Sequence, residues 1–484
     1  MFASIVILAL FLGGSSRLLA ASTAGAAPVF PVKPSANGRY LADQNGAPFF
    51  IQGDSPWDLM VQLTKSDTER YLEDRRQKGY TAIIAELMEK KYSDNPPYNK
   101  EGNAPFTTPG DFSTPNEAYF VHIDWVLSKA AEKGILVFLF PCFLGYDAGT
   151  DGWWAEVNAN GATKCRNYGR YLGNRYKSFK NVIWIHGGDY SPPPGSAGES
   201  YVLEILLGIK DSDPTKLHTF HGRRYTTALD QAAFTSYMDL DAVYPGDDLA
   251  KAQPGDPYQG SLKAYHRTNF KPHFLIEARY ESVSGADEGG TYTADRGRLR
   301  RQAYWANLSG STGHFFGNHP VWPLRPGWDG PRGIGSPGNQ DMERLRPVFA
   351  SRAWHTLLPD QNHTVVTAGY GVFGQSDYVT AGRTGDGSLV MAYVPPTGTE
   401  KRTLTVDMTR LSGRVEAKWF NPANGAYKTV AGSPFENSGS RNLTTPGDNG
   451  TGTNDWVLVL EIAPSSFTPT DATKGRSGGA RAVP

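Results

Sequence analysis

The sequence of 484 residues contains two cysteines, so it cannot form the dense disulfide network of many small secreted domains. It also lacks an excess of charge of either sign. Its 48 basic residues balance 48 acidic ones, which argues against a protein that binds nucleic acid by neutralising phosphates. A hydrophobic fraction of 39% excludes a polytopic membrane protein, and an aromatic fraction of 12% is too high for a disordered chain. These absences leave an ordered globular protein.

Patterns typical of metal and phosphate chemistry are also absent. Cys142 and Cys165 do not have metal-site spacing, and their positions leave open whether they form one disulfide. His314 and His319 flank one apolar segment, but no H-x-x-x-H pattern or nearby cysteine accompanies them, so no zinc site is expected. The chain has no P-loop and no G-x-S-x-G elbow, which disfavours phosphoryl transfer and an α/β-hydrolase esterase. We therefore expect no metal and no organic cofactor.

The N-terminus has the composition of an export signal. Residues 1–21 combine an apolar run with small polar residues and alanines, which fits a signal-peptidase site. The run is shorter than the ~20 residues that a membrane span needs, so no stable membrane insertion is expected after processing. A buried N-terminal strand or helix is the alternative, because no Lys or Arg precedes the apolar run. We expect a signal peptide over residues 1–26 and a secreted protein, extracellular or periplasmic.

Short apolar runs that end in polar or small residues alternate with helical segments along most of the chain. Segments 66–79 and 117–134 are two such helices, each closed by a glycine suited to a left-handed C-cap. Alternating strands and helices imply parallel pairing, and eight units predict an α/β fold of the (β/α)8 TIM barrel type. An open doubly wound sheet is less favoured, because no G-x-G-x-x-G follows the first strand. The eight runs are 48–55, 80–89, 135–143, 181–190, 217–222, 240–247, 272–281 and 313–319.

The pattern changes after about residue 355. Short β-rich runs follow one another there, separated by Gly, Pro, Asn and Asp turns and without helical periodicity between them. This texture predicts an antiparallel β-sandwich. We therefore expect a barrel over residues 28–355, a sandwich over 356–465 and a disordered tail over 466–484, which has few large apolar residues.

Carboxylates at the ends of the apolar runs are the first candidates for chemistry. Asp54, Glu86, Asp189 and Glu277 all occupy such positions, and the loops after barrel strands form the active face. Two carboxyl groups that flank one cavity suit glycoside hydrolysis, in which one donates a proton and the other attacks or activates water. We rank Asp189 and Glu277 highest, because each follows a strongly apolar stretch where an ionisable group needs partners or a task. The structural alternative is a turn cap at Asp189 and a Glu277–Arg279 ion pair.

Further residues near these ends could assist. His186 and the two glycines after it could let the backbone approach a substrate, and Arg279 could keep the Glu277 carboxylate ionised, since i and i+2 share a strand face. Aromatic rings could stack on the C–H faces of sugars. Each ring alone is explained as well by core packing, so their concentration at one face carries the argument. These rings are Trp57, Trp153, Trp154, Tyr190, Tyr244, Tyr280, Trp322 and Trp328.

Three segments resemble the apiosidase-like glycoside hydrolases, which are secreted barrel enzymes with a small β-domain behind the barrel. The segments are FIQGDSPWDLM (50–60), IWIHGGDYSP (183–192) and FLIEARYE (274–281), and the resemblance covers residues 28–355. The region after the barrel resembles the domain that this family labels as collagen-binding. By this resemblance Asp189 is the acid/base and Glu277 the nucleophile, while Asp54 and Trp57 bind substrate.

The resemblance implies a secreted glycoside hydrolase that cleaves plant or microbial polysaccharide, of the pectin or arabinan type. Retention of configuration is favoured. However, the wider group of retaining barrel enzymes has Asn-Glu where this chain has the shorter Asp189, which can widen the carboxyl separation toward the ~6.5–9.5 Å of inverting enzymes. The alternative is a non-catalytic glycan-binding or matrix-binding adhesion protein. The expected partner is a polysaccharide or oligosaccharide, and no oligomeric state is predicted. The expected substrate-binding residues are Asp54, Trp57, Glu86, His186, Tyr190, Tyr244, Arg279, Tyr280 and Trp322.

Overall fold

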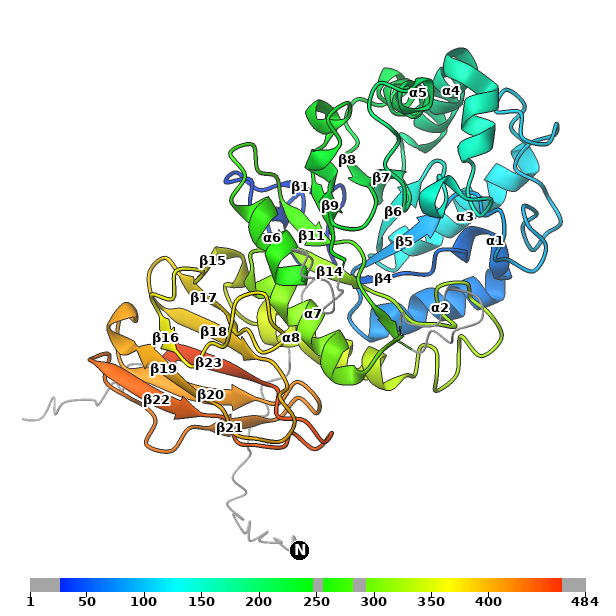
Figure 1. The fold of residues 1–484 in the computed structure, drawn as a ribbon. Coiled ribbons are helices and arrows are strands. Elements are labelled where there is room, and N and C mark those ends of the chain that lie inside the picture. Colours follow the sequence, from blue (N-terminus) through cyan, green and yellow to red (C-terminus); the bar gives the residue numbers. More distant parts are fainter. Residues whose placement is uncertain (1–26, 247–255, 282–292, 464–484) are drawn as a thin grey trace, which may run out of the picture.

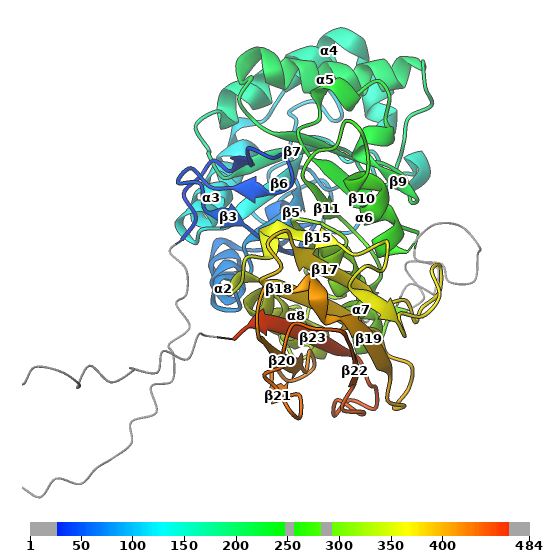
Figure 2. The same ribbon diagram turned by 90° about the vertical axis from the view of Figure 1, so that its left-hand side faces the viewer.

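The computed structural model describes residues 27–246, 256–281 and 293–463. A barrel wrapped in helices is followed by a β-domain packed against its side (Figures 1 and 2). The predicted signal peptide and the predicted C-terminal tail lie outside the described residues.

Eight parallel strands form the barrel, and each coincides with one of the eight predicted runs. They are hydrogen-bonded in the order β8-β7-β6-β5-β4-β14-β11-β10. The gap between β8 and β10 is bridged by the carbonyl oxygen of His218, which accepts hydrogen bonds from the amides of Asp239 (2.9 Å) and Leu240 (3.3 Å). The predicted (β/α)8 barrel is therefore confirmed. The strands are β4 (Ile51–Asp54), β5 (Ala82–Glu86), β6 (Leu136–Phe140), β7 (Val182–Gly187), β8 (His218–His221), β10 (Asp241–Tyr244), β11 (His273–Leu275) and β14 (Gly313–Phe316).

Helices follow most of the barrel strands and cover the outside of the barrel (Figure 1). The helices predicted over residues 66–79 and 117–134 begin at side-chain caps, Thr64 and Asn116. They end just before Gly79 and Gly134, whose φ angles are 79° and 68°. Short 3-10 turns and a small strand, instead of a helix, separate β8 from β10. The α-helices are α1 (Leu59–Gln62), α2 (Lys65–Gln77), α3 (Glu117–Glu132), α4 (Trp154–Tyr176), α5 (Ala197–Ser212), α6 (Pro257–Tyr265), α7 (Arg296–Leu308) and α8 (Pro337–Ala350). The 3-10 turns are η1 (Tyr146–Ala148), η2 (Ala228–Asp230), η3 (Thr235–Tyr237), η4 (Trp354–Thr356) and η5 (Met408–Arg410).

Short strands lie at both ends of the barrel. A three-stranded antiparallel sheet precedes it and is tied to its N-terminal end, where the amide of Leu41 donates to Thr312 Oγ1 at 3.2 Å. At the other end β9 pairs antiparallel with β10, and β12 pairs with β13. These strands are β1 (Lys33–Pro34), β2 (Leu41–Ala42), β3 (Pro48–Phe49), β9 (Thr226–Thr227), β12 (Tyr280–Glu281) and β13 (Thr293–Ala294).

Alternation of side chains along each strand separates the barrel interior from the helix-facing side. Phe138 lies inside, with ring centroids 5.1 Å from those of Phe274 and Phe315 on two other strands. Trp184 points the other way, with its ring 6.0 Å from that of Tyr176 on α4. The parallel register carries this alternation from strand to strand, so it determines which strand-end residues face the mouth of the barrel.

The β-domain consists of two antiparallel sheets, ordered β15-β17-β18-β23-β20-β21 and β16-β19-β22. Its core is built from alternating apolar residues of both sheets, which confirms the antiparallel architecture expected from the sequence. The strands are β15 (Leu357–Pro359), β16 (Val366–Ala368), β17 (Thr380–Thr384), β18 (Leu389–Val394), β19 (Thr403–Asp407), β20 (Val415–Phe420), β21 (Tyr427–Thr429), β22 (Ser440–Thr444) and β23 (Trp456–Ile462).

Helix α7 joins the barrel to the β-domain. Tyr304 stacks on Tyr393 of the β-domain at 4.9 Å, and the buried Arg300 forms an ion pair of 2.7 Å with Asp455. Apolar side chains of both domains belong to one continuous cluster around this helix. The two domains therefore share part of their core, and separating them would expose this apolar surface to water.

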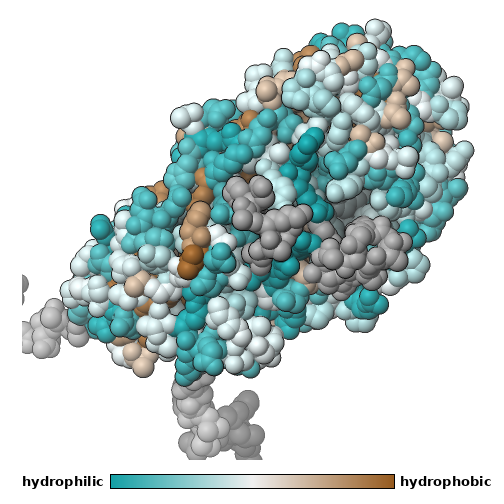
Figure 3. Space-filling model, in the orientation of Figure 1, coloured by the Kyte–Doolittle hydropathy of each residue, from teal (hydrophilic) through white to brown (hydrophobic). Residues whose placement is uncertain are grey.

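Cys142 and Cys165 are both buried free thiols, so the disulfide that their spacing left open is not formed. Burial raises the pKa of Cys165 to about 12, which keeps this thiol protonated and unreactive. The face of the molecule in Figure 3 is mainly hydrophilic. In the described ranges, no helix has both the length and the apolar character needed to cross a membrane.

Candidate active site

Asp189 occupies a strained turn at the end of β7. Its φ angle is 51°, and it follows Gly187 and Gly188, whose φ angles are 84° and 118°. A Cβ atom at Gly187 would lie 2.3 Å from the carbonyl oxygen of His221, and one at Gly188 would lie 2.3 Å from the ring of Phe143. Both glycines are therefore required by space as well as by conformation. A left-handed non-glycine residue held in this way is typical of a functional position.

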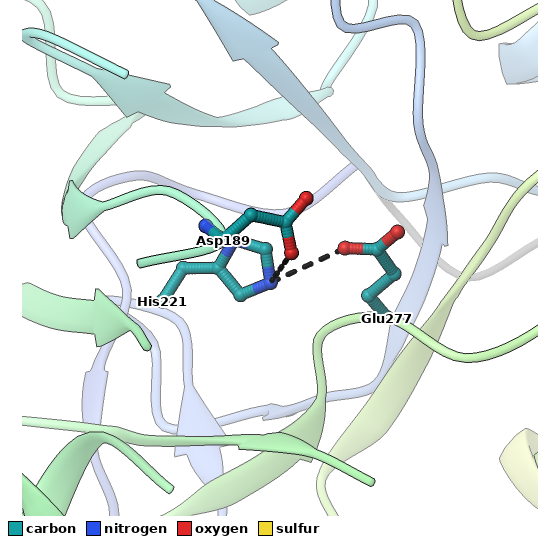
Figure 4. A group of neighbouring side chains, drawn as sticks. All are labelled: Asp189, His221 and Glu277. Atoms are coloured by element: carbon teal, nitrogen blue, oxygen red, sulfur yellow. Dashed lines mark hydrogen bonds and ion pairs between the residues drawn. The ribbon is translucent and has the colours of Figure 1, made fainter. Parts of the chain in front are cut away.

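Three side chains converge at the mouth of the barrel. Figure 4 shows the carboxyl groups of Asp189 and Glu277 directed at the same edge of the His221 ring. His221 Nε2 lies 3.2 Å from Glu277 Oε2 and 4.0 Å from Asp189 Oδ1. One carboxylate oxygen of Asp189, one of Glu277 and one ring nitrogen of His221 all lie within 4.8 Å of one another. Glu277 is 8% exposed and His221 is fully buried, so both side chains are shielded from solvent and their charges interact strongly.

His221 is held in place by its own surroundings. The backbone amide of Asp189 donates to His221 Nδ1 at 3.4 Å, which leaves the proton of a neutral ring on Nε2, facing the carboxylates. The ring of Trp57 stacks on the imidazole at 5.9 Å, and the indole N–H of Trp57 donates to the Tyr280 hydroxyl at 2.8 Å. Trp57 and Tyr280 thus form an aromatic wall beside the three converging side chains, a trio made of Asp189, His221 and Glu277.

Burial dominates the electrostatics of Asp189. Together with the negative charge of Glu277, which is the second cause, burial raises the pKa of this carboxyl to about 7. His221, a hydrogen bond from Tyr244 and the charge of Arg224 act in the opposite direction. Asp189 therefore carries a proton through the weakly acidic range, as a general acid must.

Glu86 closes another side of the mouth. It ends β5 on the interior face, and burial followed by the charge of Glu89 raises its pKa well above the usual range of a carboxyl group. The Tyr244 ring, at the end of β10, lies 4.7 Å from the ring of His221. The structure therefore brings together, around Asp189 and Glu277, four other residues predicted from the sequence. These are Trp57, Glu86, Tyr244 and Tyr280.

Two predicted rings lie in the surrounding loops. Tyr190 directly follows Asp189 and packs edge-on against Trp154 at 5.0 Å. Trp322 is almost completely buried, with Tyr92 packed edge-on at 4.9 Å. Their substrate-binding roles stay predictions.

Two predicted substrate-binding residues face away from the mouth. Asp54 is completely buried on the helix-facing side of β4, where it accepts hydrogen bonds from Arg75 (3.0 Å) and Tyr71 (2.7 Å) of α2. His186 shares the helix-facing side of β7 with Trp184, and its Nε2 lies 2.9 Å from Nδ1 of His218. Direct contact of Asp54 or His186 with a sugar is therefore not supported. Asp54 ends β4 and His186 is the last residue but one of β7, and both lie on the outer face of the strand.

The proposed partnership of Arg279 with Glu277 rested on a shared strand face. Strand β11 ends at Leu275, two residues before Glu277, so strand alternation does not set the relative directions of the two side chains. Glu277 instead faces His221. The carbonyl of Arg279 accepts a hydrogen bond of 2.8 Å from Gln302 of α7, which fixes the backbone after Glu277.

Sequence reasoning missed His221. Its run, LHTFHG, was identified as a barrel strand, but the last histidine was not assigned a role. His221 is the interior-facing residue at the end of β8, in register with Gly187 of β7. A carboxyl-terminal position on the inner face was the available signal.

Within the described ranges, Asp189, His221 and Glu277 are also the one group of His, Asp and Glu atoms close enough to contact a single ion. The trio is explained as an acid–base group by its burial and by the raised pKa of Asp189. No further cofactor-binding pattern was found in the sequence.

The sequence pattern of the "Apiosidase-like, catalytic domain" matches residues 35–356, about two thirds of the chain. The chain belongs to the apiosidase-like family. It is a glycoside hydrolase, so the non-catalytic alternative is disfavoured. A second pattern, described as "Putative collagen-binding domain of a collagenase", matches residues 358–461 of this apiosidase-like protein. No sequence relative among curated proteins matches it.

Solved structures share the fold of this apiosidase-like enzyme. A family 5 glycoside hydrolase from Bacteroides vulgatus has 22% sequence identity and a TM-score of 0.74, covering 89% of this chain and 93% of the other. A second structure, described as a glycoside hydrolase, has 23% identity and a TM-score of 0.73, covering 89% of this chain and 97% of the other. Both coverages include the barrel and the β-domain, so the two-domain arrangement is shared.

Proposed function

We propose that the enzyme is a retaining glycoside hydrolase with Glu277 as nucleophile and Asp189 as acid/base. The observation that carries this proposal is that one carboxylate oxygen of Asp189 and one of Glu277 lie within 4.8 Å of each other. Retaining enzymes place the two groups about 5–5.5 Å apart, whereas inverting enzymes need ~6.5–9.5 Å to admit a water molecule between them. The strained turn at Asp189 and the long side chain of Glu277 offset the shortness of the aspartate.

In the first step, a Glu277 carboxylate oxygen attacks the anomeric carbon while the glycosidic C–O bond breaks. Asp189 gives its proton to the departing oxygen, which leaves as a hydroxyl group. In the second step, the Asp189 carboxylate takes a proton from water as the water oxygen attacks the anomeric carbon. The bond between the anomeric carbon and Glu277 breaks in the same displacement, and both carboxyl groups return to their starting states.

The substrate that we propose is a plant or microbial polysaccharide, of the pectin or arabinan type that the family resemblance implies. The aromatic wall of Trp57 and Tyr280 supports a sugar substrate, because C–H faces of sugars pack on such rings. Export through the N-terminal segment 1–26 would bring the enzyme to this substrate. Sequencing the N-terminus of the mature protein tests export.

Product stereochemistry tests the mechanism. Proton NMR of the reaction on pectic or arabinan oligosaccharides is expected to detect first a product with the same anomeric configuration as the substrate. Initial release of the opposite anomer would refute retention. Glu277→Gln is expected to lower kcat by about 10³-fold or more with unchanged unfolding temperature, since it removes the attacking carboxylate while keeping its shape.

A further inference from the structure

Glu277 lies beyond the end of its strand, so strand pairing does not fix the segment that carries it. Strand β11 ends two residues before it, and the segment 276–281 runs from there to the loop after β14. Glu281 is the last residue of this segment. Its amide donates to the carbonyl oxygen of Gly317 at 3.0 Å, and its carbonyl oxygen accepts from the amide of His319 at 2.9 Å. The backbone of Glu281 therefore holds the far end of the segment.

The side chain of Glu281 provides a second attachment. It is 6% exposed, and its carboxylate accepts hydrogen bonds from Asn318 Nδ2 at 2.9 Å and from Ser336 Oγ at 2.5 Å. A third comes from the amide of Gly338 at 2.8 Å, in the first turn of α8. The start of a helix favours a carboxylate, because its free amides carry partial positive charge. A Cβ atom at Gly338 would lie 2.5 Å from Glu281 Oε2, so this close approach of the helix requires glycine.

Tyr280 belongs to the same segment and lines the mouth. Its ring lies against the backbone of Gly317, where a Cβ atom would come within 2.4 Å of the ring. Its hydroxyl accepts the indole N–H of Trp57 at 2.8 Å. Because Glu277 and Tyr280 are four residues and one residue before Glu281, a shift of Glu281 would move both of them.

We propose that Glu281 is a positioning residue, which fastens the segment 276–281 to α8 and thereby holds the Glu277 carboxyl group within reach of the anomeric carbon. This inference rests on the proposed role of Glu277 as nucleophile. The three hydrogen bonds of the Glu281 carboxylate go to residues outside the trio, so Glu281 acts through the backbone. An attacking atom must lie about 3–3.5 Å from its target, and a misplacement of ~1 Å can cost about 10²-fold in rate.

The test compares two matched variants of the full-length enzyme. Glu281→Gln places amide hydrogens where three donors already converge, so the segment should shift and kcat/KM should fall about 10- to 100-fold. Asp360→Asn is the control, because the Asp360 carboxylate is also buried and also accepts from backbone amides, those of Thr364 and Val366, but lies in the β-domain. Both variants should have a lowered unfolding temperature. At a temperature where both are folded, Glu281→Gln should have lost activity and Asp360→Asn should match the wild type.

The leaving group separates a displaced nucleophile from a displaced proton donor. Glu281→Gln should lower kcat/KM by the same factor on natural glycosides and on aryl glycosides with acidic leaving groups, because proton transfer from Asp189 is untouched. A merely structural role of Glu281 would lower the unfolding temperature and leave kcat/KM of the folded enzyme unchanged. A loss confined to natural glycosides would place the effect on proton transfer and overturn the inference.

Wild-type kcat/KM in folded Glu281→Gln, or an equal loss in Asp360→Asn, would also overturn it. Asn318→Ala covers the case in which Glu281→Gln does not fold, because it removes one of the three donors and leaves the carboxylate in place. It should lower kcat/KM several-fold, and an unchanged value would count against the inference. Failure of the proposed function looks different, because Glu277→Gln would then retain activity whatever the Glu281 variant does.

Discussion

The Nε2 atom of His221 lies 3.2 Å from Oε2 of Glu277, and Asp189 approaches the same atom to 4.0 Å. The imidazole therefore fixes the direction of the proposed nucleophile. His221→Phe keeps a ring of similar size against Trp57 and removes the nitrogen. We expect kcat/KM to fall about 10²-fold, as when one preorganised polar contact is lost, with little change in unfolding temperature. Steady-state kinetics with a thermal-unfolding control measure both, and an undiminished kcat/KM would refute the role.

The pKa of Asp189 predicts where activity falls on the alkaline side. Catalysis requires this group protonated, and burial raises its pKa to about 7. Activity should thus be retained below this value and decline as pH rises through it. The pH profile of kcat/KM on a natural glycoside, whose leaving group needs a proton, measures this limb. Asp189→Asn cannot ionise, so a limb that persisted in this variant would have to belong to another residue.

The leaving group offers a separate check on Asp189. Asp189→Ala should lower kcat/KM by about 10²- to 10⁴-fold on natural glycosides, whose leaving groups need a proton. On aryl glycosides with acidic leaving groups the loss of the glycosylation rate should be much smaller. A plot of log kcat/KM against leaving-group pKa should therefore be steeper for the variant than for the wild type. Equal slopes would contradict a general-acid role.

The sequence predicted the barrel strands well, because each is a compact apolar run between turn residues. It could not predict which face of each strand points inward. Strands of a parallel barrel are buried on both sides, so apolar and polar residues do not alternate visibly along them. The sequence therefore could not show that Asp54 and His186 lie on the outer faces of their strands, or that His221 lies on the inner face.

Two strands at the edges of the β-domain sheets leave little trace in the sequence, for a different reason. β15 and β22 are edge strands whose side chains are partly or largely exposed, with sequences LLP and SRNLT. Such strands are held by backbone pairing, which leaves little pattern in the side chains. The buried strands β18 and β23 were predictable because their sequences consist mainly of apolar residues.

Asp54 provides a stability prediction. Its carboxylate and the Arg75 guanidinium are both fully buried, so Asp54→Asn removes the buried partner of this cation and leaves it paired only with the partly exposed Asp74. We expect a loss of about 3 kcal/mol in the free energy of unfolding, measured with chemical denaturant. The exposed pair of Arg70 and Asp329 gives the control, and Asp329→Asn should cost less than about 1 kcal/mol. If Asp54 bound substrate directly, the folded variant would show a raised KM, which we do not expect.

Buried histidines predict loss of stability in acid. Burial lowers the pKa of His186, His273 and His314 to about 3, against ~6.5 in the unfolded chain. Because the folded pKa is the lower one, the neutral form is favoured by folding. The stability this provides is complete above ~6.5 and is lost as pH falls from there toward 3.

Denaturant unfolding between pH 7 and pH 4 measures this loss. The unfolded state takes up protons that the folded state refuses, so the free energy of unfolding should fall steadily across the window. His314 offers a clean test, since its Nε2 contacts the Met342 sulfur at 3.2 Å and no charged group. His314→Leu should reduce the pH slope by up to one proton, whereas His266→Gln, at an exposed position, should leave it unchanged. An identical slope in His314→Leu and the wild type would show that this histidine is not held neutral by its burial.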